Sequence, residues 1–291
     1  MYSAISKNKR NTVLIMAVFV ALIGVVGVVV GMLNDSYSLS VIILVMAAVY
    51  ALIQYFAASK LAMAMTGARE IQRQDAPELW RVVENLSITS GVPMPKVYLI
   101  DDPAPNAFAT GRDPQHAIVG ATTGLLRIMD KRELEAVMAH EMSHVQNYDI
   151  RVSMIAFGLV SAIGLLADVA LRMMFFGDNR DRNVHPVVYL LGLAVVILAP
   201  ILAAITQMAI SRQREYLADA SGALLTRDSE GLASALEKLK TYGQPMQKQT
   251  TSTANLFMSD PLKPGFFAKL FSTHPPLDER IARLRGNATK M

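Results

Sequence analysis

Two long uncharged stretches at the N-terminus constrain the fold of this chain more than any other feature. Residues 11–34 and 36–59 contain no charged side chain, and only Asp35 separates them. A bilayer core about 30 Å thick requires about 20 apolar residues in a helix. The sequence therefore predicts two membrane-spanning helices joined by a tight turn. A signal peptide is the alternative for the first stretch, but that stretch is longer than a usual signal core and lacks a small-residue cleavage site.

Charge and composition indicate how these helices are oriented. Basic residues flank the outer ends of the pair: Lys7, Lys9, Arg10, Lys60, Arg69 and Arg73. By the positive-inside rule both outer ends lie in the cytoplasm. The chain is 52% hydrophobic, too apolar for an ordinary soluble domain, and its net charge of +4 is scattered, which indicates no nucleic-acid partner. It has no cysteine, which excludes disulfides and thiolate metal sites.

Two further apolar stretches, 152–171 and 187–211, predict a second hairpin. Asp168 lies near the end of the first of them, where Arg172, one turn later, is a suitable partner. A helical hairpin that packs on the soluble part without spanning is the alternative. We expect four parts: a membrane hairpin (1–60), the first part of a soluble domain (61–150), a second membrane hairpin (151–211) and the second part of the soluble domain (212–291).

The soluble parts predict a mainly helical domain with a small β-sheet. We expect a helix from an N-cap at Asp75 to Gly91 and another from Asp130, with Glu133 at the capping-box position. Strands are expected at 96–100, 106–111 and 116–120, a helix at 229–242, a mobile polar loop at 244–255 and a short last helix.

The helix that begins after Asp130 contains the pattern HExxH. His140 and His144 are four residues apart, so both rings project from one face, as two nitrogen ligands of one zinc ion require. Glu141, next to the first of them, can face the open coordination position and accept a proton from water. The pattern therefore predicts a catalytic metal site with one Zn²⁺ per chain.

A catalytic zinc site takes three protein ligands, and no histidine follows at the spacing of the metzincin type. Glu215 and Asp219 lie four residues apart on a later predicted helix. We expect Glu215 to be the third ligand and Asp219 to orient His140 or His144. The chain between His144 and Glu215 must then cross the membrane an even number of times, which the second hairpin satisfies, so the site should lie close to the membrane.

The motifs HEMSH, EYLAD, NAFATG and THPP, together with the two apolar hairpins, resemble the HtpX membrane metalloproteases, a group related to the CAAX prenyl proteases. The resemblance covers nearly the whole chain. It implies a multi-pass membrane protein with a gluzincin-type zinc metallopeptidase domain. It also implies a bacterial or archaeal cytoplasmic membrane, an active site facing the cytoplasm, and degradation of misfolded or damaged membrane proteins under stress. Its partners would be polypeptides and the lipid bilayer; nothing in the sequence indicates an oligomeric state.

The resemblance assigns His140, His144 and Glu215 as zinc ligands and Glu141 as the catalytic base. It further implies that His274 faces the site and stabilises the oxyanion. The segment 106–111 would be the edge strand of the cleft, with substrate-binding residues Asn106, Ala107, Phe108 and Ala109. An exposed strand edge can pair with any extended peptide; an ordinary hairpin strand is the alternative. We expect His116 and His185 to have no function and Arg280 to form a structural ion pair.

Two other functions remain open from the sequence. One is a non-enzymatic membrane protein with a structural or sensory zinc site. Such a site would fill its fourth position with Cys or His, whereas this chain has no cysteine and keeps a glutamate at the base position. The other is a membrane prenyl-CAAX protease, with the same chemistry on a different substrate; the presence of only four apolar segments favours the smaller bacterial type.

Overall fold

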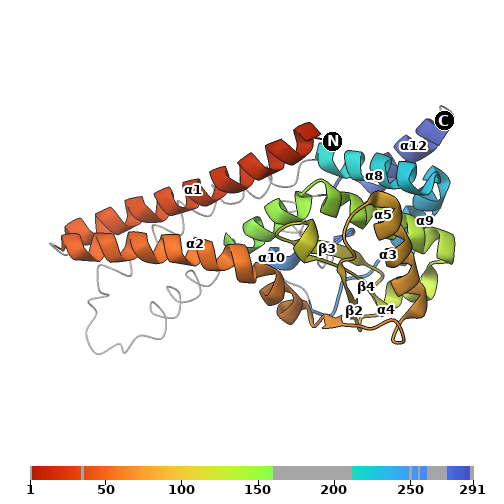
Figure 1. The fold of residues 1–291 in the computed structure, drawn as a ribbon, viewed down its shortest axis with the longest axis horizontal. Helices are drawn as coiled ribbons and strands as arrows, with labels where there is room; N and C mark the ends of the chain where they lie inside the picture. The colour runs from red at the N-terminus through yellow and green to blue at the C-terminus, as the bar shows by residue number, and fades with distance from the viewer. Residues whose placement is uncertain are drawn as a thin grey trace.

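A long helical hairpin extends from a compact domain (Figure 1). The computed structural model describes residues 2–33, 36–159, 212–248, 251–254, 256–260 and 274–288. Helix α1 (Tyr2–Leu33) and helix α2 (Tyr37–Thr66) form the hairpin and pack along each other. The Ser36 side chain caps α2 by accepting from the Leu39 amide, and Gly67 ends α2 with a left-handed φ of 74°. The tight turn that the sequence predicts between the two apolar stretches, at Asp35, lies outside the described residues.

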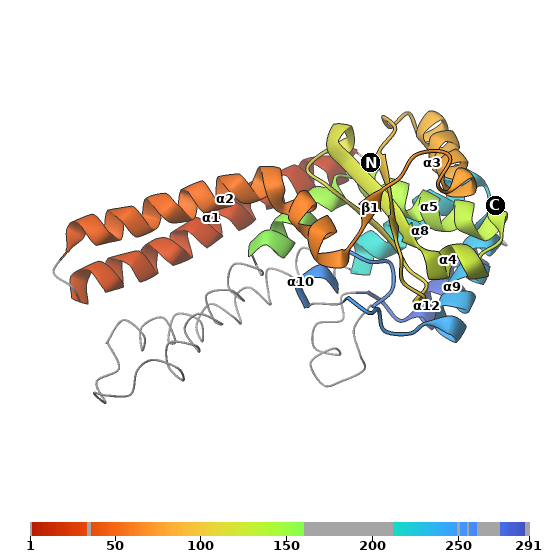
Figure 2. The same ribbon diagram turned by 90° about the horizontal axis from the view of Figure 1, so that it is seen from below.

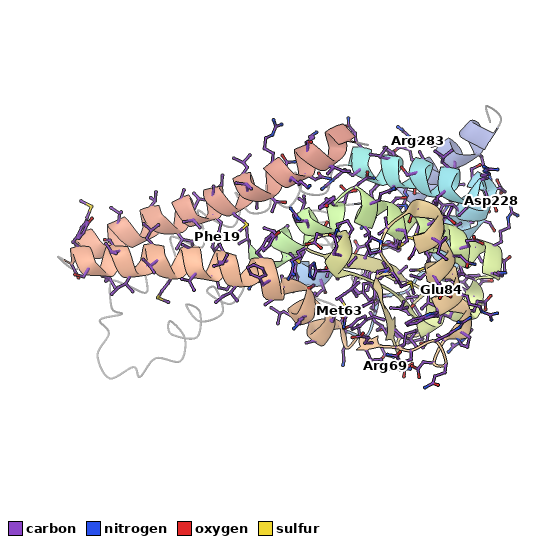
Figure 3. All side chains as sticks on the ribbon, viewed as in Figure 1. Phe19, Met63, Arg69, Glu84, Asp228 and Arg283 are labelled. Atoms are coloured by element: carbon purple, nitrogen blue, oxygen red, sulfur yellow. The ribbon has the colours of Figure 1, made fainter. Side chains whose placement is uncertain are left out.

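The hairpin has an apolar surface that nothing in the described chain covers. Within the described residues, two helices are long and apolar enough to cross a membrane, over Ile5–Val25 and Tyr37–Thr66. Side chains project from the hairpin on all sides along its length (Figure 3). The exposed large apolar residues of α2 are Tyr37, Val41, Ile42, Leu44, Val45, Met46, Val49, Leu52, Ile53, Phe56 and Leu61. An apolar surface of this extent on a monomer is typical of contact with lipid or with another protein.

A four-stranded mixed sheet in the order β1-β2-β4-β3 supports the domain. The strands are β1 (Arg69–Glu70), β2 (Lys96–Ile100), β3 (Ala107–Gly111) and β4 (Ala117–Thr122). β2 and β4 are parallel, whereas β3 pairs antiparallel with β4, with Ala109 opposite Val119. The three predicted strands are therefore confirmed, and β3 is an edge strand of this sheet.

Helix α5, which contains the HExxH pattern, lies at the centre of the domain. It contacts β3 and β4 on one side and α3, α8 and α9 on the others (Figure 2). The helices of the domain are α3 (Pro77–Ser90), α4 (Thr123–Ile128), α5 (Lys131–Gln146), α8 (Arg212–Thr226), α9 (Ser229–Tyr242), α10 (Thr251–Ala254) and α12 (Leu277–Ala288). The predicted fold class, mainly helical with a small sheet, is confirmed.

Capping residues in the sequence predict most of the observed helix ends correctly. Asp130 and Glu133 form the predicted capping box of α5, each side chain accepting from the other residue's amide. Gly91 ends α3 in the left-handed conformation. The predicted cap at Asp75 is wrong by one residue: Ala76 is the N-cap, and the Asp75 carboxylate accepts from the Gln72 amide at 2.7 Å instead.

Two other expectations fall wholly or partly outside the described residues. Of the second apolar hairpin, the structure describes only the start, within a helix at 149–159. The segment 244–255 was expected to be mobile, but its described part contacts the domain. Met246 is buried, and the Gln247 amide donates to Asp102 Oδ2 at 2.7 Å. A buried apolar side chain within the polar run explains the difference.

Candidate metal centre and active site

Two histidines of α5 face each other across a small gap. Their rings are nearly perpendicular, with centroids 4.7 Å apart, and their Nε2 atoms are 3.2 Å apart. The His140 side chain is fully buried, and that of His144 is 15% exposed. The i,i+4 spacing thus brings two ring nitrogens to one point, as the sequence predicts.

Helix α8 adds a carboxylate at the same point. Glu215 Oε1 lies 3.5 Å from His144 Nε2, and Oε2 lies 3.7 Å from His140 Nε2. Ligands 2.0–2.1 Å from a tetrahedral zinc ion would be about 3.3 Å from one another. Glu215 Oε2 is buried and has no hydrogen-bond partner. Because three potential ligand residues converge and one buried carboxylate oxygen makes no hydrogen bond, the group fits a metal ion.

Asp219, one turn after Glu215 on α8, pairs with His140. Its Oδ1 lies 2.9 Å from His140 Nδ1. Arg280, on α12, donates to both oxygens of Asp219, from Nε at 2.9 Å and from Nη2 at 2.6 Å. Burial opposes the charge on Asp219, but Arg280 and the hydrogen bond with His140 outweigh it and lower its pKa to about 2. The partner of Asp219 that the sequence left open is thus His140.

Arg280 does more than the structural pairing expected of it. Its side chain is fully buried, and its Nη1 lies 3.4 Å from Glu215 Oε2. It therefore contacts both Glu215 and Asp219 and supplies positive charge to the two buried carboxylates of α8. Buried charges require such compensation to be tolerated.

Asp149 pairs with His144, an arrangement that the sequence analysis missed. Asp149 Oδ2 lies 3.1 Å from His144 Nδ1. Burial opposes a proton on His144, but Asp149, Glu215 and Glu141 outweigh it and raise the pKa of His144 to about 9. Each histidine therefore has a carboxylate on its Nδ1 side, which leaves Nε2 for the common point. Such partners fix the tautomer and ring orientation of metal-ligating histidines.

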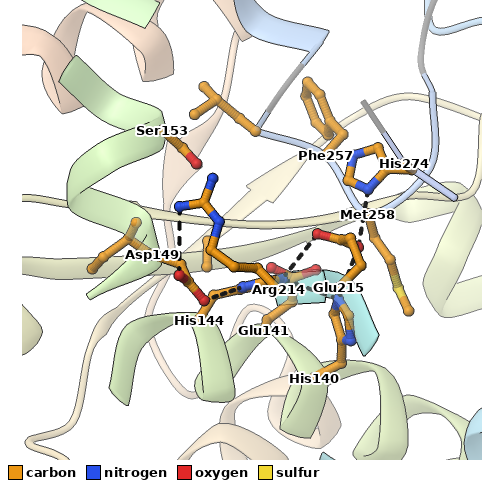
Figure 4. Close-up of a pocket in the computed structure, with 13 residues that line it drawn as sticks. His140, Glu141, His144, Asp149, Ser153, Arg214, Glu215, Phe257, Met258 and His274 are labelled. Carbon is orange, nitrogen blue, oxygen red and sulfur yellow. Dashed lines mark hydrogen bonds and ion pairs between the residues drawn. The ribbon is translucent and has the colours of Figure 1, made fainter. Parts of the chain in front are cut away.

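Glu141 lines the pocket beside the two histidines and is 2% exposed (Figure 4). Burial, opposed by the charge of His144 and reinforced by that of Glu215, raises its pKa to about 7. A carboxyl group with a pKa near neutrality exchanges protons readily at physiological pH. The residue thus has the position and the proton affinity of a general base or acid.

His274 also lines this pocket, as the resemblance implies (Figure 4). Its Nδ1 lies 3.0 Å from Glu215 Oε2, but the two are not aligned for a hydrogen bond, and neither ring nitrogen has a hydrogen-bond partner. The ring thus lies against Glu215 without a hydrogen bond, and its Nε2 can donate to another polar group in the pocket. His116, in contrast, lies at an exposed turn beside Asp113, and His185 is outside the described residues.

The predicted edge strand borders the pocket but its edge is not open. Ala109 of β3 is one of the residues that line the pocket. Residues 256–258 lie along the outer edge of β3: Phe257 forms a bridge with Phe108, and the Met258 amide donates to the Ala107 carbonyl at 2.9 Å. The Asn106 side chain holds the same segment through the backbone N–H and C=O of Ser259, at 3.0 and 2.8 Å.

Arg214 is a second pocket residue that the sequence analysis missed. Its Nη1 lies 3.6 Å from Asp149 Oδ1, and both terminal nitrogens are buried without a hydrogen-bond partner. The residue directly precedes Glu215 in the sequence, and that adjacency was the only available signal. The guanidinium group of Arg214 places positive charge at the end of the pocket near Asp149 and Ser153 (Figure 4).

A fold with HExxH on a central helix, a glutamate on a second helix and an acidic residue one turn later defines the class of the metallopeptidases with two histidines and a glutamate. Comparison with known proteins identifies the family. The chain belongs to Peptidase family M48, whose profile matches residues 73–288, about three quarters of its length. It is therefore a metalloprotease, a hydrolase that acts on peptide bonds.

Relatives match over nearly the full chain. A "Protease HtpX homolog" of Tropheryma whipplei (strain Twist) is 57% identical over 286 residues, covering 98% of each chain. One of Ligilactobacillus salivarius (strain UCC118) is 46% identical, covering 98% of this chain and 99% of the relative. The crystal structure of Ste24p from S. mikatae has the same fold, with a TM-score of 0.53 at 19% identity, over 98% of this chain and 67% of that one. The resemblance to HtpX proteases is confirmed.

Proposed function

We propose that this protein is a zinc-dependent membrane endopeptidase in which His140, His144 and Glu215 hold the metal ion. The observation that carries the proposal is the convergence of these three side chains beside Glu141. The two Nε2 atoms are 3.2 Å apart, one Glu215 oxygen lies 3.5 Å from His144 Nε2, and the other lies 3.7 Å from His140 Nε2. A zinc ion bound there would polarise the carbonyl of a peptide bond and lower the pKa of a water molecule. Two nitrogens and one carboxylate form a ligand set typical of catalytic zinc.

The surrounding residues perform the proton and charge chemistry. Glu141 accepts the proton of the attacking water and returns it to the leaving amine. His274, whose ring nitrogens have no hydrogen-bond partner, donates to the oxygen on which negative charge develops. Asp219 and Asp149 hold His140 and His144 with Nε2 toward the common point. Hydrolysis in this scheme requires no covalent link between enzyme and substrate.

The substrate is an extended polypeptide that pairs with the edge of β3, at Asn106, Ala107, Phe108 and Ala109. Support comes from the place of Ala109 in the pocket and from residues 256–258, which already bind this edge through their backbone. That backbone contact supports the proposal, and a substrate would replace or extend it. Recognition through backbone atoms is independent of side chains, which suits misfolded or damaged membrane proteins as substrates.

We place the active site on the cytoplasmic side of a bacterial cytoplasmic membrane, crossed by 1–60 and by 151–211, with the peptidase domain formed by 61–150 and 212–291. The basic residues at the outer ends of the first hairpin support this orientation. The two relatives named above, which match over 98% of this chain, come from bacteria. Degradation of damaged proteins at that surface would serve protein quality control under stress.

Metal analysis of the purified protein tests the proposal. The detergent-solubilised chain should contain about one zinc ion and cleave an unfolded membrane-protein substrate. A chelator should remove zinc and activity together, and added zinc should restore both. A protein that hydrolyses peptides equally well without metal contradicts the proposal, as does a zinc-loaded protein that hydrolyses none. The second outcome would favour a structural or sensory zinc site.

A further inference from the structure

The carboxylate that pairs with His144 comes from a strained turn. Helix α5 ends at its C-cap, Asn147, and the next helix begins at Asp149. Tyr148 between them has a φ of +62°, a left-handed conformation that is unfavourable for a non-glycine residue. The turn ends the helix and returns the Asp149 carboxylate to 3.1 Å from His144 Nδ1. Such a conformation persists only where surrounding contacts enforce it.

The first turns of the N-terminal helix α1 supply those contacts. The Asn8 side-chain amide donates two hydrogen bonds, to the Asn147 carbonyl at 2.9 Å and to Asp149 Oδ1 at 2.7 Å. It therefore joins both sides of the turn with a single group. The ammonium of the adjacent Lys9 lies 4.5 Å from the centre of the Tyr148 ring, on the residue with the left-handed conformation.

The burial of Asn8 indicates a specific role. It is 3% exposed although it lies among the basic residues that precede the apolar part of α1. A buried amide without partners is costly, so its two N–H groups restrict how α1 can dock. A cation, Arg214, also lies near Asp149, but its Nη1 is 3.6 Å from Asp149 Oδ1 and makes no hydrogen bond to it. Asn8 thus provides the short hydrogen bond that fixes the Asp149 oxygen not facing His144.

We propose that Asn8 is a positioning residue of the metal site, acting on His144 through Asp149. This inference rests on the proposed function, because it takes His144 to be a metal ligand. Asn8 holds the carboxylate, the carboxylate holds Nδ1 of His144, and Nε2 is thereby directed to the metal. The metal site is complete only when the first membrane helix is docked on the peptidase domain, so full activity is coupled to correct assembly at the membrane.

Zinc affinity of the full-length protein in detergent, measured by competition with a chromophoric chelator, tests this. Asp149→Asn should weaken zinc binding about 10- to 100-fold, as loss of a ligand's hydrogen-bond partner does. Asn8→Ala acts one bond further away and should weaken it about 3- to 10-fold. Asn11→Ala, the same change one turn along the same helix, is the matched control and should leave affinity unchanged. Asn8→Ser keeps one hydroxyl donor and should fall between the parent and Asn8→Ala.

The double variant separates this role from general destabilisation. If Asn8 acts through Asp149, Asn8→Ala should change zinc affinity less than about twofold when Asp149→Asn is already present. The visible spectrum of the Co²⁺-substituted protein should change in Asn8→Ala and not in Asn11→Ala, because it reports ligand geometry. The inference is overturned if Asn8→Ala and Asn8→Ser both bind zinc like the parent. It is equally overturned if Asn8→Ala weakens binding by the same factor in both backgrounds.

The proposed function fails by a different result. If His144 is not a metal ligand, the parent protein and His144→Ala would bind zinc equally poorly, and no Asn8 variant would change the zinc affinity further. Normal zinc binding by the parent together with normal binding by the Asn8 variants contradicts the role of Asn8 alone.

Discussion

At the scale of single residues, the site consists of buried carboxylates, histidines and an arginine whose opposite charges stabilise one another. Glu215 and Asp219 leave α8 on the same face, and Arg280 contacts both. Their roles differ, because Glu215 reaches the common point of the two histidine Nε2 atoms whereas Asp219 reaches only Nδ1 of His140. Neighbouring carboxylates on one helix can therefore be separated by experiment.

Replacing Glu215 with Ala should abolish hydrolysis and weaken zinc binding more than replacing Asp219 does. Asp219→Ala should lower zinc affinity or activity about 10- to 100-fold, because the Asp219 carboxylate orients the ligand His140 without contacting the metal. Zinc titration and peptide hydrolysis on both variants provide the measurement. Full zinc occupancy in Glu215→Ala, with another carboxylate proving essential for binding, would show that the third ligand is assigned wrongly.

At the scale of secondary-structure elements, α5 is held in place at its first turn. Glu133 accepts from the Asp130 amide, from Lys238 and from the Ser234 hydroxyl of α9. Burial would raise its pKa, but the bonds to Lys238, Asp130 and Ser234 outweigh burial and lower it. This turn begins the helix that carries both histidines, so its stability supports the site.

Glu133→Gln should lower the free energy of unfolding by about 1–3 kcal/mol at neutral pH. Since the pKa is lower in the folded protein, the carboxylate's contribution is complete above its unfolded pKa of about 4.3 and is lost as the pH falls through the folded pKa. Thermal unfolding of the variant and the parent in detergent should therefore converge under acid conditions. A difference that persists unchanged there would exclude this carboxylate as its source.

Strand β3 yields a prediction about substrates. If a peptide pairs with its edge, N-methylation of the peptide backbone should reduce cleavage at every second residue near the scissile bond. In a strand only alternate residues direct their N–H toward a given neighbour. Rates for a set of singly N-methylated peptides test this. Uniform rates across the set would indicate that substrates are held by side chains and not by this edge.

What the sequence could predict follows from the range of each interaction. HExxH, the capping box at Asp130 and the i,i+4 spacing of Glu215 and Asp219 are local patterns on single helices, and each lies where expected. Asp149 could not be assigned, because its approach to His144 depends on the left-handed Tyr148, which no helical spacing indicates. The role of Arg280 depends on how α12 packs against α8, and that packing has no local signal.

At the scale of the whole molecule, the account predicts how the chain lies in the membrane. The start of α1 contacts the turn beside His144, so the outer end of the first hairpin and the metal site are on the same side. The absence of cysteine allows single cysteines to be introduced without background. Cysteines at Asp35 and Asn183 should react with an impermeant thiol reagent added outside intact cells, whereas those at Ser229 and Ala288 should not. Protection at 183 alone would mean that 151–211 does not span the bilayer.

The central claim is that Glu141 performs proton transfer at a metal held by three other residues. The most direct measurement is zinc content and peptide hydrolysis of Glu141→Gln in the same preparation. The account predicts zinc content equal to that of the parent and a loss of hydrolysis of at least about 100-fold, the lower range for a general base. Hydrolysis at the parent rate by zinc-loaded Glu141→Gln protein would contradict it.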